Sequence, residues 1–294
     1  MKNMKFTIIT FYQFKKTNNI DKNINFLKEF CLFNKIKGTI LFANEGINGT
    51  VAGLENSIIS LKNEILKLGF SDLEIKTSFF KYMPFNRLKI KIKKEIVTFG
   101  DLKIDVEKNT AKHINFSEWN DIINSDDTLL IDVRNNFENK MGAFQKAINP
   151  LTKNFSEFKR YVDNVLSKNK KKKIAMYCTG GIRCEKASAY YKHKGFKNVY
   201  QLEGGIIEYA RQIKEERLEN KFLGKNFVFD ERRAERISED VISKCHQCQE
   251  PCDTHVNCKN KGCHLLFIQC EACQEKMLTT CSDNCKKIVE MPEE

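Results

Sequence analysis

The stretch Tyr177-Cys178-Thr179-Gly180-Gly181-Ile182-Arg183-Cys184-Glu185-Lys186 decides the central fold of this chain. The apolar run 174–177 predicts a buried strand that ends at the cysteine, and 187–194 is compatible with a helix. Backbone N–H groups and the positive end of a helix dipole favour a thiolate at such a position, and Arg183 adds a full positive charge. The sequence therefore predicts a reactive thiol at Cys178, rather than a buried structural cysteine.

Strands and helices alternate on both sides of this stretch. Apolar strands are expected at 129–133, 173–177 and 199–202, and helices at 117–124, 156–166, 187–194 and 206–214. This pattern predicts a central α/β domain over residues 116–218, with a parallel sheet covered by helices on both faces. Ligands of such sheets lie beyond the carboxyl ends of the strands, where both Cys178 and Asp132-Val133-Arg134 fall.

Residues 1–96 predict a separate domain. Strands are expected at 5–14, 36–43, 49–53, 73–79 and 88–92, and helices at 21–34 and 54–68. The order β-α-β-β-α-β, with one strand to spare, is typical of a ferredoxin-like (acylphosphatase-like) α+β sandwich. The turn Asn44–Asn48 fits either a plain hairpin connection or a polar surface for a phosphate or a base. Residues 97–115 predict a linker between the two domains.

The net charge of +12 is unevenly distributed along the chain. Residues 1–110 carry 19 basic and 11 acidic side chains, and residues 111–216 carry 19 basic and 13 acidic ones. Residues 217–294 carry 12 basic and 14 acidic side chains. The excess of basic side chains in residues 1–216 favours binding of a polyanion such as RNA. One basic strand face is predicted from Lys89, Lys91, Lys93 and Lys94. A general bias toward Lys, Asn and Ile explains the same charge without any ligand.

Nine of the twelve cysteines fall between residues 245 and 285, in the C-terminal region 219–294. Two Cys-x-x-Cys pairs, each followed by a spaced pair, indicate two structural zinc sites, with an iron–sulfur cluster as the alternative. We expect sequential grouping: Cys245, Cys248, Cys258 and Cys263 in one site, and Cys270, Cys273, Cys281 and Cys285 in the other. A cross-braced grouping, or substitution by His246, His255 or His264, is the alternative, and Cys252 is left over.

The composition excludes several classes of protein. No apolar run approaches the roughly 20 residues of a membrane span, and no signal peptide is visible, so we expect a soluble cytoplasmic protein without a membrane partner. Such a location argues against a disulfide framework. Phosphate-binding and dinucleotide fingerprints are absent, no flavin, haem or nicotinamide motif is seen, and no His-x-Asp/Glu pair for iron is present.

Four residues near the predicted thiol have alternative roles. Cys184 either resolves an oxidised Cys178 as a disulfide or faces the core. Asp132 either orients the loop or caps a turn, and Arg134 either forms a structural ion pair or faces a phosphate. Lys186 either adds to the positive field or is an ordinary solvated helix residue.

Four separated blocks carry a resemblance to a known family. MYCTGGIRCEKASAYY at 176–191 is preceded by ILFANEGINGTVAG at 40–53 and followed by GKNFVFDERRAERIS at 224–238 and the cysteine-rich tail. The loop Cys178–Arg183, the earlier Asp-Val-Arg and the later Glu-Gly-Gly resemble the rhodanese fold. The four blocks together resemble the rhodanese-domain tRNA uridine hydroxylases, and this resemblance covers essentially the whole chain. One departure is that the segment 141–144 lacks the histidine often found beside its glycine in rhodaneses.

The resemblance implies oxygen-dependent 5-hydroxylation of the wobble uridine, position 34, in the anticodon region of tRNA. It aligns Cys178 with the family's catalytic cysteine and Arg183 with the residue that closes the loop, with Thr179, Gly180, Gly181, Ile182 and Cys184 beside them. Molecular oxygen is then a co-substrate. The residues themselves support a thiolate that attacks C6 of a pyrimidine, or alternatively a rhodanese-type sulfurtransferase that carries a persulfide on Cys178.

Overall fold

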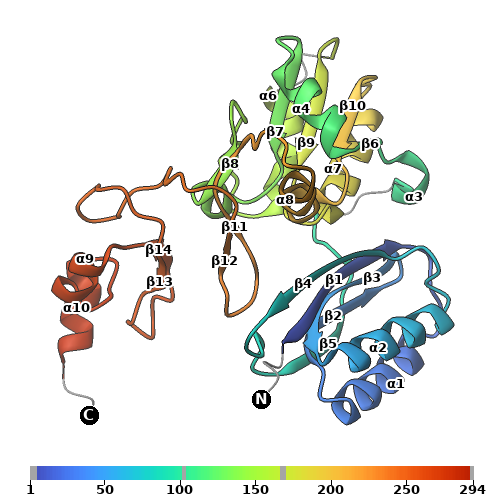
Figure 1. Ribbon diagram of the computed structural model, residues 1–294, viewed down its shortest axis with the longest axis horizontal. Helices are drawn as coiled ribbons and strands as arrows, with labels where there is room; N and C mark the ends of the chain where they lie inside the picture. Colours follow the sequence, from blue (N-terminus) through green and yellow to red (C-terminus); the bar gives the residue numbers. More distant parts are fainter. Residues whose placement is uncertain (1–4, 101–103, 166–169, 292–294) are drawn as a thin grey trace.

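The computed structural model describes residues 5–100, 104–165 and 170–291. The chain forms three parts: an N-terminal domain with a five-stranded sheet, a central domain with a four-stranded sheet, and a cysteine-rich C-terminal region (Figure 1). No helix in those residues is long and apolar enough to cross a membrane.

The N-terminal domain has the predicted ferredoxin-like topology. Its elements are β1 (Phe6–Phe14), α1 (Ile20–Phe33), β2 (Lys37–Ala43), β3 (Gly46–Gly53), α2 (Glu55–Lys67), β4 (Glu74–Phe80) and β5 (Leu88–Ile92). The strand order is β4-β1-β3-β2-β5. The spare strand of the sequence pattern is β5, which extends one edge by pairing parallel to β2. Two residues, Asn44 and Glu45, join β2 to β3 as a hairpin.

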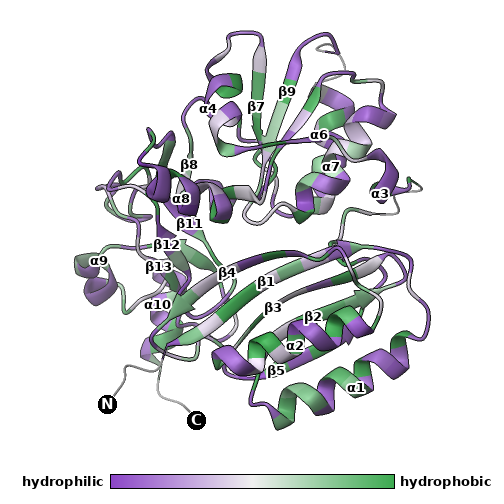
Figure 2. Cartoon of the chain, turned by 45° about the vertical axis from the view of Figure 1, so that its right-hand side comes forward, coloured by the Kyte–Doolittle hydropathy of each residue, from purple (hydrophilic) through white to green (hydrophobic). Residues whose placement is uncertain are grey.

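Alternation along the strands separates the two faces of this sheet. Ile9, Phe11, Ile40 and Phe42 are fully buried in the core that α1 and α2 cover. The opposite face carries the intervening, mostly polar side chains, and it lies toward the central domain (Figure 2). The sheet is therefore placed to form one wall of a site between the two domains.

The central domain contains the predicted parallel sheet, in the order β6-β10-β9-β7. Its elements are α3 (Val106–Asn109), β6 (Lys112–Ile114), α4 (Phe116–Asn124), β7 (Thr128–Asp132), α5 (Asn136–Asn139), β8 (Gly142–Phe144), η1 (Phe155–Glu157), α6 (Phe158–Val165), β9 (Lys173–Tyr177), α7 (Ile182–His193), β10 (Val199–Leu202) and α8 (Gly205–Glu216). Residues 97–115 are thus more than the linker we expected. They contain α3 and β6, because β6 hydrogen-bonds to β10 as an edge strand.

The C-terminal region is attached to the central domain by strand pairing. Its elements are β11 (Phe222–Phe227), β12 (Ala234–Arg236), β13 (His255–Asn257), β14 (Leu266–Ile268), α9 (Glu271–Lys276) and α10 (Asp283–Glu290). Strand β11 pairs antiparallel with both β8 and β12 in a small sheet that the sequence did not predict. The pairing with β8 ties the segment after α8 to the loop that follows β7.

Candidate active site between two domains, and two cysteine clusters

The loop after β9 holds the sulfur of Cys178 in a cradle of backbone amides. The Gly181 amide donates to the Cys178 sulfur at 3.1 Å, and α7 begins at the next residue. The carbonyl groups of Cys178 and Thr179 accept hydrogen bonds from the amides of Ile206 and Ile207, at 3.0 and 3.1 Å. The first turn of α8 therefore holds the start of the loop in place.

This environment favours the thiolate of Cys178. Burial opposes ionisation, but the hydrogen bond from Cys184, the charge of Arg183 and the amides of both residues together lower the pKa of Cys178 to about 6. The cysteine is only 1% exposed. Most of the thiol is therefore ionised at neutral pH, as expected from the sequence.

Cys184 lies in the core beneath the loop. It is fully buried, and its thiol forms a hydrogen bond with Cys178. Burial, together with this hydrogen bond and the charge of Cys178, raises the pKa of Cys184 well above its usual value. Cys184 therefore stays a neutral thiol that stabilises the neighbouring thiolate.

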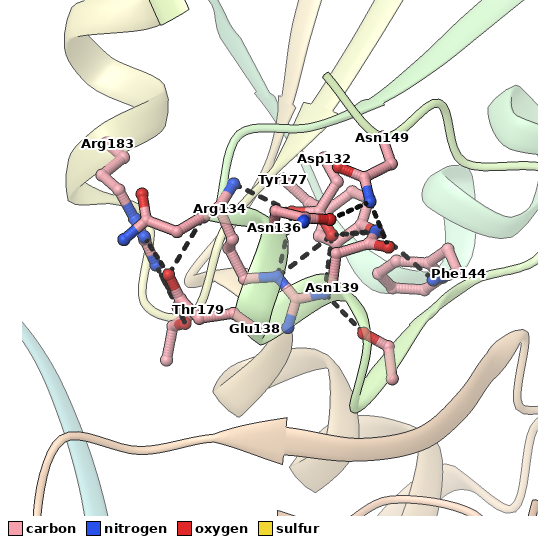
Figure 3. Close-up of polar contacts among 12 residues, drawn as sticks. Asp132, Arg134, Asn136, Glu138, Asn139, Phe144, Asn149, Tyr177, Thr179 and Arg183 are labelled. Atoms are coloured by element: carbon pink, nitrogen blue, oxygen red, sulfur yellow. Dashed lines mark hydrogen bonds and ion pairs between the residues drawn. The ribbon is translucent and has the colours of Figure 1, made fainter. Parts of the chain in front are cut away.

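Arg183 points toward a carboxylate on α5 and also lines the cavity beside the loop. Its guanidinium nitrogens lie 2.6 and 2.8 Å from the two oxygens of Glu138 on α5, and it also donates to the Thr179 hydroxyl at 3.2 Å (Figure 3). Glu138 is fully buried. No role was predicted for Glu138, although the pair Phe137-Glu138 shortly after the strand end at Arg134 was an available signal.

Asp132 and Arg134 form a second buried pair beneath the site. The Arg134 guanidinium donates to Asp132 at 2.6 Å and to the Gly142 carbonyl at 2.6 Å, and both side chains are fully buried. Asp132 also accepts from Tyr177 and Asn139, both at 2.9 Å (Figure 3). Arg134 is thus a structural ion pair and does not face a phosphate, and Asp132 fixes the end of β7.

Lys186 is neither a solvated residue nor a contributor to the open side of the loop. It is 1% exposed, and its ammonium group lies 2.8 Å from Glu45 and 2.6 Å from Glu95 of the preceding domain. Both predicted roles of Lys186 are therefore wrong. The reason is tertiary: the hairpin turn at Glu45 and the segment after β5 pack against α7.

A cavity of about 600 Å³ opens above Cys178. Its walls include the polar face of the first sheet, the loop Cys178–Arg183, the segment 228–235 after β11 and residues 154–156. Its lining includes Tyr12, Cys178 and Arg232. Arg232 ties the third wall to the first by donating to the Ser78 hydroxyl at 3.2 Å. A volume of this size is typical of sites that enclose a small organic group.

The close approach of β1 explains the two glycines of the loop. A Cβ atom at Gly180 would lie 3.7 Å from the Thr10 side chain, and one at Gly181 would lie 2.8 Å from the Tyr12 hydroxyl. Gly181 also has a φ of +100°, which side chains rarely tolerate. Position 181 therefore requires glycine, whereas a Cβ atom at position 180 would make only an ordinary van der Waals contact.

Models of known protein families match all three parts of the chain. A UPF0176 acylphosphatase-like domain matches residues 6–96, a rhodanese-like domain matches residues 116–212, and a rhodanase C-terminal model matches residues 223–286. These matches coincide with the three parts of the fold.

Named relatives extend over nearly the whole chain. A tRNA uridine(34) hydroxylase from Photorhabdus laumondii is 42% identical over 98% of this chain and 83% of its own length. The chain belongs to the tRNA uridine(34) hydroxylase family. A member from Leptospira interrogans is 41% identical over 99% of this chain and 80% of its own length. One from Yersinia pestis is 44% identical over 87% of this chain and 74% of its own length.

In this member of the hydroxylase family, eight cysteines of the C-terminal region form two compact groups. One contains Cys245, Cys248, Cys270 and Cys273, and the other contains Cys258, Cys263, Cys281 and Cys285, with all ligand atoms of a group within 4.8 Å of one another. The sequential grouping that we expected is therefore wrong, and the cross-braced alternative is correct. Neither group includes a histidine, and Cys252 is buried outside both.

Backbone pairing explains the cross-braced grouping. The amide of His246 donates to the Ile268 carbonyl at 2.8 Å, which brings the first Cys-x-x-Cys pair beside the second. The amide of Lys259 donates to the Thr279 carbonyl at 3.0 Å, which brings Cys258 close to Cys281 in the second group.

The spacing of the sulfurs fits a tetrahedral metal ion. Sulfurs placed about 2.3 Å from a central zinc ion are about 3.8 Å apart. The Cys248–Cys270, Cys263–Cys281 and Cys281–Cys285 sulfur pairs are each 3.7 Å apart. Each group can therefore hold one metal ion.

Proposed function

We propose that this protein hydroxylates C5 of the wobble uridine, position 34, of tRNA to give 5-hydroxyuridine, with molecular oxygen as co-substrate and Cys178 as the catalytic residue. The observation that carries the proposal is the low-pKa thiol of Cys178 at the base of a cavity walled by two domains. The names of relatives that are 41–44% identical to this chain support the reaction.

The thiolate supplies the activation that C5 needs. Addition of the Cys178 sulfur to C6 of the uracil ring moves electron density onto C5 and O4, which makes C5 the nucleophilic carbon. Molecular oxygen then supplies one oxygen atom to C5, while an external two-electron donor and two protons reduce the other atom to water. Loss of the C5 proton and release of the sulfur from C6 restore the double bond. Cys184 stabilises the departing thiolate by the hydrogen bond described above.

A wobble nucleotide suits this cavity because anticodon loops are single-stranded. An unpaired base can leave its neighbours and enter a pocket at low cost. Lys89 and Lys91 are exposed and share the sheet face that lines the cavity, because Lys89 pairs with Thr39 and Lys91 with Leu41. We place the RNA backbone along this edge, and we place the protein in the cytoplasm with its tRNA.

The cysteine groups complete the proposal as structural zinc sites. All-thiolate tetrahedral sites without an open position are typical of structural zinc. The ions would hold together a region whose strands, β13 and β14, are only three residues each.

Nucleoside analysis of tRNA from cells that lack the gene tests the proposal. Loss of 5-hydroxyuridine and its derivatives, restored by the wild-type gene and not by Cys178→Ala, is the expected result. Restoration by Cys178→Ala would exclude the assigned role. Unchanged nucleosides, together with a persulfide on Cys178 in the purified protein, would select the sulfurtransferase alternative instead.

A further inference from the structure

Tyr12 of the first domain reaches the reactive loop of the second. It lines the same cavity as Cys178, and its hydroxyl lies 2.8 Å from the position that a Cβ atom of Gly181 would take. The hydroxyl donates a hydrogen bond to Glu185 on α7 at 2.9 Å. Tyr12 is only 4% exposed, so its hydroxyl lies in a buried setting beside the loop.

Glu185 connects Tyr12 to the outside of the protein. Glu185 is 6% exposed, and its carboxylate also accepts hydrogen bonds from Thr110 and, at 3.1 Å, from Gln201. The Nε2 atom of His113 lies 2.9 Å from the carboxylate oxygen that Tyr12 contacts, and the His113 side chain is 39% exposed. A continuous hydrogen-bonded path therefore runs from the cavity through Tyr12, Glu185 and His113 to solvent.

The charges around this path keep Glu185 ionised and Tyr12 neutral. Burial raises the pKa of Glu185, but His113, Thr110 and Gln201 bring it below its usual value. The pKa of Tyr12 lies well above normal because of burial and then of Glu185 and Glu74.

The remaining charged groups act on the two ends of the path. The hydrogen bond with Glu185 raises the pKa of His113 against the effect of burial, and Glu74 and Glu203 add to it. The ammonium group of Lys76 lies 4.8 Å from the centre of the Tyr12 ring. In the resting site, Glu185 is therefore ready to accept a proton that Tyr12 passes on.

We infer that Tyr12, backed by Glu185, is the general base that removes the C5 proton of the substrate. This inference rests on the proposed function. The C5–H electrons form the C5–C6 double bond, the C6–S bond breaks, and its electrons return to Cys178 as the thiolate. The proton goes to the Tyr12 oxygen while the Tyr12 proton moves to Glu185, and Glu185 passes a proton through His113 to solvent. Tyr12 is then a catalytic residue, and Glu185 and His113 are positioning residues.

An isotope experiment separates this role from a purely structural tie between domains. Addition of Cys178 to C6, protonation at C5 and reversal exchange the C5 hydrogen with water, and these steps need neither oxygen nor a reductant. We use full-length protein and tRNA that carries tritium at C5 of uridine, under anaerobic conditions. Wild type should release tritium, and Tyr12→Phe should release it about 100-fold more slowly, the usual contribution of a general base. The KM for tRNA and the alkylation rate of Cys178 should stay unchanged.

Further variants keep the inference testable. Glu185→Gln should slow exchange, and Glu185→Asp should restore part of it at unchanged KM. Tyr161→Phe, a matched loss of a hydroxyl on α6 beside Phe158, should exchange like wild type.

Two results would overturn the inference. Exchange by Tyr12→Phe at the wild-type rate is one, and hydroxylation by wild type without any exchange is the other. Failure of the proposed function is a separate outcome, seen when Cys178→Ala still hydroxylates tRNA.

Discussion

Arg183 and Glu138 form a two-pronged ion pair, with nitrogen–oxygen distances of 2.6 and 2.8 Å, although 45 residues separate them in sequence. Side-chain exposure is 9% for Arg183 and 0% for Glu138. The pair joins α5 to the start of α7, and so it fixes the loop in which Cys178 lies. Arg183 is thus ion-paired with Glu138, and its positive charge lowers the pKa of Cys178.

Loss of this carboxylate should destabilise the protein. Glu138→Gln leaves Arg183 buried without its counter-charge, which typically lowers the free energy of unfolding by about 3–5 kcal/mol. Urea denaturation measures the change. Glu118→Gln, an exposed glutamate on α4, is the matched control and should change stability by less than about 0.5 kcal/mol. Equal stabilities for the two variants would contradict the importance of the pair.

The reactivity of Cys178 should follow the ionisation of its thiol. With a pKa of about 6, the rate of alkylation by iodoacetamide should rise between pH 5 and pH 7 and then level off. At pH 5 the rate should be about one tenth of the plateau, since only that fraction is thiolate. Mass spectrometry of the peptide containing Cys178 gives the rate. A midpoint near 8.5, the ordinary cysteine value, would show that the loop does not stabilise the thiolate.

The contact between Lys186 and Glu95 should make domain docking sensitive to acid. The pKa of Glu95 lies below its usual value: burial raises it, but Lys186 and the amides of Phe99 and Gly100 outweigh this effect. A lowered pKa in the folded state stabilises the protein above the ordinary glutamate pKa of about 4.3, and this stabilisation is lost as pH falls through the folded value.

Lys186→Met should therefore lower the free energy of unfolding by about 1–3 kcal/mol at pH 7. The difference from wild type should shrink in acid below about pH 4. Thermal denaturation at several pH values measures it. A difference that is independent of pH would exclude the ion pair as its cause.

Paired cysteine substitutions should reveal the cross-braced metal sites. Cys245→Ser with Cys270→Ser removes two ligands of one group, so one of two metal ions should be lost. Cys245→Ser with Cys258→Ser removes one ligand from each group, so both should be lost or weakened. Elemental analysis of the purified variants measures the metal content. The reverse result would restore the sequential grouping.

Lysines at the sheet edge should contribute to tRNA binding. Lys89→Glu with Lys91→Glu should raise the KM for tRNA. The slope of log K for tRNA binding against log salt concentration should become shallower by roughly 0.9 for each phosphate contact that is lost. The matched control is Lys22→Glu with Lys28→Glu on α1, which packs on the opposite face of the same sheet. Identical salt dependence in both double variants would place the RNA elsewhere.

The reactive cysteine could be predicted because its chemistry is local. A strand end, two glycines and a helix start are consecutive in the sequence, and the amides that cradle the sulfur belong to the same ten residues. The ferredoxin-like and parallel sheets were predictable for the same reason, since the period of burial along each element reports its own backbone geometry. The set of eight ligand cysteines also followed from spacing alone.

Tertiary structure decided which distant residues meet. The partner of Tyr12 is Glu185, 173 residues away, and Lys186 is neutralised by a hairpin turn of another domain. Glu138 faces Arg183, and the cysteines are grouped by strands that fold back on one another. These relations depend on how elements pack across long separations, which the periodicity within an element does not encode. The sequence by itself determined which cysteine lies in the glycine loop and which eight cysteines gather in the two groups; the packing of the domains determined the cavity and the side chains that lie around Cys178.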